Sequence, residues 1–223
     1  MLSAKEIHRE FQTASAVLPV LKGINLDVKQ GETVAVTGAS GVGKSTLLHI
    51  MGGLDRPTSG EVWLRGKSLS GQSEKSLAMV RNQRIGFVFQ FHYLLEDFSA
   101  LENVMIPMLV AGVRKSAAAD NGEQLLKLVG LEDRMDHRPH QLSGGEQQRV
   151  AVARALANKP EVVLADEPSG NLDTATGRKL HDLLFELNSQ QGITFLIATH
   201  NQELARSCRK NLEIVDGIIV ERD

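Results

Sequence analysis

Short apolar runs rich in β-branched residues alternate along the chain with stretches of helical periodicity. The run Thr33–Thr37 (T-V-A-V-T) and the run 161–165 (E-V-V-L-A) have the composition of strands that are buried on both faces. Leu21–Val28 instead alternates apolar and polar residues, which predicts a half-buried strand. Further strands are predicted at 61–65, 85–89 and 193–198, and a closing hairpin at 212–216 and 217–220.

Helical patterns predict helices at 44–51, 121–129, 145–157 and 175–187. The apolar run 104–113 contains Pro107 and has about half the length needed to cross a bilayer, so it predicts a buried or partner-facing helix. Strands interspersed with helices predict a mostly parallel sheet, and the early strands on short turns predict an antiparallel sheet beside it. The chain is therefore expected to have an α/β fold.

Composition narrows the function classes. The 223 residues contain 25 Lys and Arg against 27 Asp and Glu, and this net charge of −2 gives no basic surplus for binding nucleic acid. The single cysteine, Cys208, rules out an internal disulfide and suits a reducing compartment. The N-terminus lacks the apolar core of a signal peptide. No run approaches the roughly 18–20 apolar residues of a membrane span, so we expect another chain to hold this one at any membrane.

Residues 38–46 read G-A-S-G-V-G-K-S-T and lie between a predicted strand and a predicted helix. The pattern Gly-x-x-x-x-Gly-Lys-Ser in that context predicts a phosphate-binding P-loop. The glycines let backbone N–H groups converge on phosphate oxygens at the start of the helix. Lys44 adds a positive charge for the outer phosphates, and the Ser45 hydroxyl is suited to bind Mg²⁺. The alternative is a chance glycine loop, and the flanking strand and helix argue against it.

Two further stretches carry chemistry. Asp166 and Glu167 follow an apolar strand, at the end where α/β folds bind ligands. Asp166 is suited to the Mg²⁺ shell and Glu167 to polarising an attacking water, whereas a surface acid pair is the alternative. In 142–149 (L-S-G-G-E-Q-Q-R), Ser143 can cap a helix and the two glycines leave N–H groups bare, which predicts a second anion-binding helix start. An ordinary helix cap is the alternative.

With the P-loop upstream and the acid pair downstream, the stretch 142–149 resembles the signature sequence of the ATP-binding-cassette (ABC) ATPases. Gln90 matches the Q-loop glutamine of that family, which touches Mg²⁺ and the attacking water, and Ser169–Asp173 matches its D-loop. His200 matches the switch histidine that contacts the γ-phosphate. Phe11 replaces the usual tyrosine that stacks on adenine, and Ser169 replaces a usual threonine.

The resemblance covers the whole chain and implies ATP and Mg²⁺ as cofactors. It implies nucleotide-binding residues Phe11, Gly38, Ala39, Ser40, Gly41, Val42, Gly43, Lys44, Ser45, Thr46, Ser143, Gly144, Gly145, Glu146 and Asp173, metal ligands Ser45, Gln90 and Asp166, and catalytic residues Glu167, His200, Gln90 and Lys44. It implies one ABC ATPase domain over 1–223, with a P-loop NTPase (RecA-like) core and an N-terminal antiparallel β subdomain from 1–89 and 160–223. A helical subdomain with the signature motif is inserted at 90–159.

The family also implies partners. A second copy of the chain would complete an ATP-sandwich dimer, and integral membrane transporter subunits would dock near Phe91–Phe98, which is unusually apolar for a loop. The alternative is that these side chains fold back into the helical subdomain. No nucleic acid partner is implied, and the membrane is reached only through the partners.

The stretch 90–104 most resembles the branch that releases lipoproteins from the bacterial inner membrane, which implies a peripheral position on its cytoplasmic face. A related efflux or cell-division complex, signalling through a membrane protein, would carry nearly the same motifs. A DNA-repair or translation ATPase would need a long coiled-coil insertion or tandem cassettes, and the chain has neither.

Overall fold

The computed structural model describes residues 1–13 and 16–221. A six-stranded sheet forms its centre, in the order β10-β9-β3-β8-β7-β6. All neighbouring strands are parallel except β10, which closes the edge as an antiparallel hairpin with β9. The strands are β3 (Thr33–Thr37), β6 (Ile85–Val88), β7 (Val162–Asp166), β8 (Thr194–Ala198), β9 (Lys210–Val215) and β10 (Ile218–Glu221). The mostly parallel sheet and the closing hairpin predicted from the sequence are confirmed.

A second sheet is antiparallel and four-stranded, in the order β2-β1-β4-β5. Its strands are β1 (Leu2–Gln12), β2 (Val17–Val28), β4 (Ser59–Leu64) and β5 (Lys67–Ser68). The antiparallel sheet was expected, but β1 was missed because its alternation is irregular. The register of β1 shifts after Ala4 in its pairing with β2 and after Lys5 in its pairing with β4. Glu6, which lies at this irregularity, has a φ of 48°.

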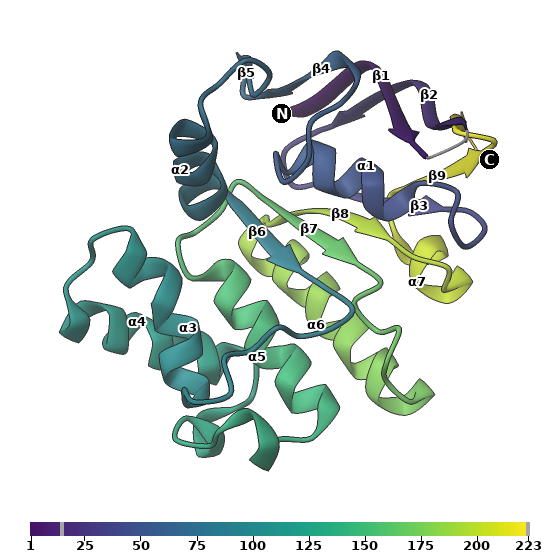
Figure 1. Cartoon of the computed structure of the whole chain (residues 1–223). Helices are drawn as coiled ribbons and strands as arrows, with labels where there is room; N and C mark the ends of the chain where they lie inside the picture. Colours follow the sequence, from purple (N-terminus) through teal and green to yellow (C-terminus); the bar gives the residue numbers. More distant parts are fainter. Residues whose placement is uncertain (14–15, 222–223) are drawn as a thin grey trace.

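The helices cover the central sheet and extend beyond it (Figure 1). They are α1 (Lys44–Met51), α2 (Glu74–Arg84), α3 (Ala100–Val110), α4 (Lys115–Leu128), α5 (Gly144–Leu156), α6 (Thr174–Gln191) and α7 (Gln202–Ser207), with 3₁₀ turns at Glu132–Arg134 and Pro139–Gln141. The helices α3, α4 and α5 pack together as a lobe beside β6, which we call the helical lobe. The sequence missed α2, since Leu77 is its one buried residue, and it also missed the short α7 and the first turns of α4.

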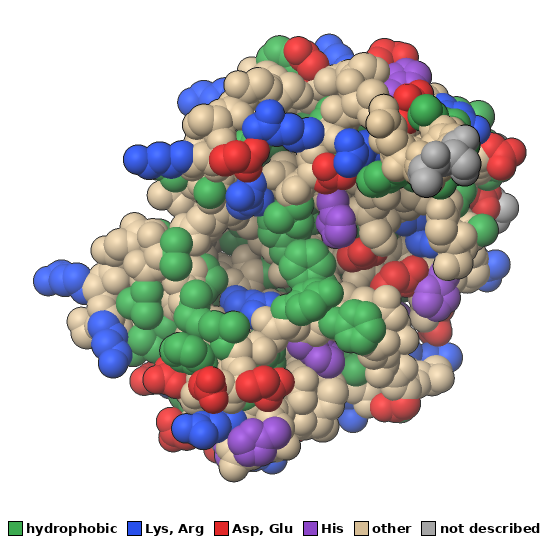
Figure 2. All heavy atoms as spheres, in the orientation of Figure 1, with side chains coloured by type: hydrophobic (Ala, Val, Ile, Leu, Met, Phe, Trp, Pro, Cys, Tyr) green, Lys and Arg blue, Asp and Glu red, His purple; other side chains and the backbone are tan. Residues whose placement is uncertain are grey.

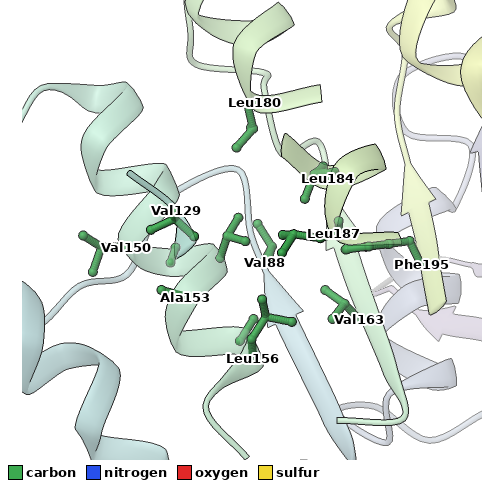
Figure 3. Close-up of a cluster of buried hydrophobic side chains, with 14 of the residues drawn as sticks. Val88, Val129, Val150, Ala153, Leu156, Val163, Leu180, Leu184, Leu187 and Phe195 are labelled. Carbon is green, nitrogen blue, oxygen red and sulfur yellow. The ribbon is translucent and has the colours of Figure 1, made fainter. Parts of the chain in front are cut away.

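Two hydrophobic cores lie on opposite faces of the central sheet. One surrounds α1 and joins it to both sheets, with Leu2, Leu26, Ile50 and Leu196 among its buried residues. The other packs α5 and α6 against the opposite face of the central sheet (Figure 3). Because alternate residues of β7 and β8 enter the two cores, both strands are almost wholly buried, which the composition predicted for β7. Within residues 1–13 and 16–221, no helix combines the length and hydrophobicity that crossing a membrane requires.

Strand register decides where the candidate site residues lie. Val36 in β3 and Asp166 in β7 both pair with Ala198 in β8. The three parallel strands therefore end together, and the residues that follow them meet at one edge of the sheet.

Candidate active site

The loop after β3 has the geometry of a phosphate cradle. Gly38 has a φ of 142° and Gly43 a φ of 110°, which L side chains rarely adopt, and a Cβ at Gly38 would lie 2.6 Å from the Ile214 carbonyl oxygen. Lys44 Nζ donates to the carbonyls of Gly38 and Ala39 at 3.0 and 3.1 Å, so the charged head is folded back over the loop. Gly43 is the N-cap residue of α1 and has no side chain that could cap the helix. The first N–H groups of α1 are therefore available to an anion.

A cleft of about 430 Å³ opens above this loop, which is within the usual size range of small-molecule sites. It is lined by Val20, Ser40, Gly41, Gly43, Lys44, Ser45, Thr46, Gln90, Glu167 and His200. The structure thus brings together P-loop residues and three predicted site residues that lie far apart in the sequence.

Asp166 ends β7 beside the P-loop helix. Burial raises the pKa of its carboxyl group, while a hydrogen bond from Ser45 and the nearby charges of His49 and Lys44 act in the opposite direction. Its Oδ1 is buried and has no hydrogen-bond partner among the described residues. A desolvated carboxylate with one unpartnered oxygen, next to a serine hydroxyl, is a set of groups that a bound Mg²⁺ would satisfy. The residues present therefore fit the metal.

Glu167 is held firmly at the next position. Its backbone has a φ of 44°, and its N–H donates to the Ala198 carbonyl at 2.8 Å. Its Oε2 accepts hydrogen bonds from Thr199 Oγ1 and from the His200 backbone N–H, both at 3.1 Å. Its Oε1 lies 2.9 Å from His200 Nδ1 and 3.9 Å from Lys44 Nζ. The carboxylate is thus oriented toward the P-loop cation from a strained backbone position.

Gln90 follows β6 and is joined to the loop after β7. Its Nε2 donates to Asn171 Oδ1 at 3.0 Å, and Asn171 Nδ2 donates to the Gln90 carbonyl at 3.0 Å. Asn171 was part of the motif in the sequence, but no role was predicted for it. Gln90 and Asn171 are 81 positions apart in the sequence, so a local pattern of residue types could not predict that their side chains bond.

The signature residues lie elsewhere. None of the residues that line the cleft in the described part of the chain belongs to 143–146. Ser143 and Glu146 form a capping box at the start of α5, and the hydrogen bonds from Ser143, aided by Arg134, lower the pKa of Glu146. Gly145 is buried, and a Cβ there would overlap Thr176 Cγ2 of α6. The explanation from bare N–H groups is therefore incomplete, since the absence of a side chain at Gly145 also lets α5 pack closely against Thr176 of α6.

Asp173 and Phe11 also lie outside the cleft lining, as do Gly38, Ala39 and Val42 of the P-loop and the predicted metal ligand Asp166. Asp173 caps α6 by accepting from the N–H groups of Ala175 and Thr176 at 3.0 Å, and hydrogen bonds from Thr176 lower its pKa. It lines a neighbouring pocket that Glu167 and His200 share. Phe11 is 38% exposed, and the Arg9 guanidinium lies 4.5 Å from the centre of its ring. Stacking of Phe11 on adenine stays a prediction.

Comparison with known proteins identifies the family. The sequence model of the family described as "ABC transporter" matches residues 21–170. The chain belongs to the ABC transporter family. An ABC transporter relative, the "Lipoprotein-releasing system ATP-binding protein LolD" of Syntrophus aciditrophicus (strain SB), is 51% identical over 99% of this chain and 99% of its own length.

Solved ABC transporter structures share the fold. The dimeric structure of MJ0796, a bacterial ABC transporter cassette, has a TM-score of 0.91 and 40% identity, covering 100% of this chain and 97% of that one. A dimeric post-hydrolysis state of MJ0796 bound to ADP and Pi has a TM-score of 0.91 and 38% identity, with full coverage of both chains. The expected P-loop NTPase fold is thereby confirmed. As an ABC transporter ATPase, the chain binds nucleotide and hydrolyses ATP.

Proposed function

We propose that this chain is the ATP-hydrolysing subunit of an ABC system that releases lipoproteins from the bacterial inner membrane toward the outer membrane. The observation that carries this proposal is the 51% identity, over nearly the full length of both chains, to a lipoprotein-releasing system ATP-binding protein. The division-linked alternative has no comparable support.

The cleft residues supply the reaction with its binding groups. Backbone N–H groups of the P-loop and Lys44 hold the phosphates of ATP, and His200 contacts the γ-phosphate. Ser45, Asp166 and Gln90 would hold Mg²⁺, which when bound neutralises charge on the phosphate oxygens. Glu167 orients the attacking water and accepts its proton, because its carboxylate already faces the cleft.

The site is completed by a second copy of the chain. The signature helix start, residues 143–146, contributes nothing to the cleft of its own chain. It is the start of a helix, whose first N–H groups have no partner within the helix, and an anion held in the cleft of another copy would accept from them. The dimeric MJ0796 structures, at 38–40% identity, support the same assembly here.

The loop Phe91–Phe98 is proposed to dock the membrane subunits. Phe91, Tyr93, Leu95 and Phe98 are 61%, 64%, 48% and 40% exposed, whereas Leu94 is buried in the core. Folding back into the lobe, the alternative to docking, therefore applies to Leu94 alone among these five. Hydrophobic side chains gather along the hollow beside the helical lobe (Figure 2).

The loop backbone is held in place while its side chains project. Arg154 donates to the carbonyls of His92 and Tyr93, both at 2.6 Å. The fully buried Asn103 side chain bonds the backbone of Leu95, Phe98 and Ser99. Rigid exposed aromatics are typical anchors for a partner helix. Through this partner the chain would sit peripherally on the cytoplasmic face of the inner membrane.

The test is purification of the tagged chain from membranes, followed by reconstitution with the proteins that accompany it. We expect integral membrane subunits to co-purify, and the reconstituted complex to release a labelled lipoprotein from proteoliposomes only with hydrolysable ATP. Co-purification with a single membrane protein linked to cell-wall hydrolases, without lipoprotein release, would replace the proposal with the signalling alternative.

A further inference from the structure

The two side-chain amides of Gln90 and Asn171 are oriented by one fixed group, the Gln90 backbone carbonyl. A carbonyl oxygen can only accept, so the Asn171 atom that faces it at 3.0 Å must be the donor Nδ2. This places Asn171 Oδ1 on the opposite side of its amide. Since Oδ1 can only accept, the Gln90 atom 3.0 Å away must be the donor Nε2.

This arrangement leaves the Gln90 side-chain oxygen free. Among the described residues, Gln90 Oε1 has no hydrogen-bond partner, and Gln90 lines the nucleotide cleft. Gly170 closes the other side, because a Cβ there would lie 3.0 Å from Gln90 Nε2. The amide nitrogen is thus held against the loop after β7, and the oxygen, which is the end that can bind a cation, is left available.

We propose that Asn171 is a positioning residue that presents the Gln90 side-chain oxygen to the divalent cation bound with ATP. The inference rests on the proposed function, because it assumes that Gln90 is a metal ligand. Asn171 itself touches neither nucleotide nor metal in this proposal. Loss of a residue that orients a metal ligand typically weakens metal affinity by about 10–100-fold.

The test measures metal binding rather than turnover. Mn²⁺ replaces Mg²⁺ as the probe, and its affinity in the presence of ATP is measured by electron paramagnetic resonance in a Glu167→Gln background that prevents hydrolysis. We expect Asn171→Ala to weaken Mn²⁺ binding at least about tenfold. Asn171→Asp should do the same, because a carboxylate oxygen would then face the Gln90 carbonyl oxygen. ATP affinity measured without metal should stay unchanged, as should the melting temperature, since Asn171 is exposed.

A double-mutant cycle shows whether the effect passes through Gln90. In a Gln90→Ala background, Asn171→Ala should cause no further loss of Mn²⁺ affinity. Wild-type Mn²⁺ affinity in Asn171→Ala, or an equal loss in the Gln90→Ala background, would overturn this inference alone. Failure of the chain with an intact Asn171 to bind Mn²⁺ with ATP would overturn the proposed function and this inference with it.

Discussion

His200 Nδ1 lies 2.9 Å from Glu167 Oε1 at the ends of two neighbouring strands. Asp166 pairs in register with Ala198, so β7 and β8 deliver the residues that follow them to one point. The other oxygen of Glu167 accepts two hydrogen bonds from Thr199 and His200. The carboxylate is therefore oriented before any ligand binds, which suits the general-base role that we propose for Glu167.

Replacing Glu167 should separate binding from hydrolysis. Glu167→Gln keeps the shape of the side chain but cannot accept the proton, so we expect ATP binding to persist and phosphate release to fall at least about 100-fold. Without hydrolysis the ATP-bound dimer should accumulate, which gel filtration with light scattering would detect. Only monomer in the presence of ATP would contradict the shared-site arrangement for the isolated chain.

Lys44 should be required for turnover. Its Nζ is held over the P-loop by two carbonyls, and removing such a preorganised cation typically costs about 10²–10³ in rate. Lys44→Ala should therefore lose ATPase activity while circular dichroism and the melting curve show an intact fold. Lys75→Ala removes an exposed lysine of α2 and serves as the matched control. Near-normal hydrolysis by a folded Lys44→Ala chain would refute the P-loop assignment.

Asp166 should lower the stability of the ligand-free chain at neutral pH. Burial raises the pKa of Asp166 in the folded state above its ordinary value of 3.8. At pH values between the ordinary pKa and the raised one, the folded state therefore binds more protons than the unfolded state. The free energy of unfolding therefore falls as pH rises through that window. Asp166→Asn should remove this contribution and raise the melting temperature of the ligand-free chain at pH 7.

The same Asp166→Asn variant should bind ATP more weakly with Mg²⁺ than the unmodified chain does. Calorimetric titration and thermal unfolding would measure the two effects. A lower melting temperature in the ligand-free state would show that the carboxylate is stabilising, contrary to this account.

Gly145 should be required for packing of the signature helix on α6. A Cβ there would overlap Thr176 Cγ2, so Gly145→Ala should lower the free energy of unfolding by about 1–3 kcal/mol. Thr176→Ser removes the Cγ2 methyl group that the new Cβ would overlap. The double variant should therefore regain much of the free energy of unfolding that Gly145→Ala loses. Gly144→Ala is the control, because its nearest neighbour would be Leu172 Cδ2 at 3.7 Å. Equal losses from both glycine variants in urea unfolding would argue against the packing role.

Charged substitutions in the loop Phe91–Phe98 should separate folding from assembly. Tyr93→Asp and Leu95→Asp alter exposed side chains, so the chain should stay folded and bind ATP but lose retention on membranes that carry the partner. Leu94→Asp places a charge in the core and should unfold the chain instead. If the chain that carries both Tyr93→Asp and Leu95→Asp assembles normally with the membrane partner, the loop Phe91–Phe98 is not the docking site.

The sequence alone was sufficient for features whose chemistry is local. The P-loop occupies nine consecutive residues, and the acid pair directly follows its strand, so spacing and composition carried both predictions. Buried strands were recognisable because strands with both faces covered are apolar throughout. The overall α/β fold followed from the alternation of such strands with helices, and the structural comparisons confirm it.

Only the tertiary structure decided which distant residues meet. The contact of Glu167 with His200 depends on the register of β7 and β8, and the amide pair of Gln90 and Asn171 joins loops 81 residues apart. The buried environment of Gly145 likewise depends on α6 lying against α5. Such contacts arise from strand order and helix packing, which are properties of the whole folded chain, and a local pattern of residue types does not contain them.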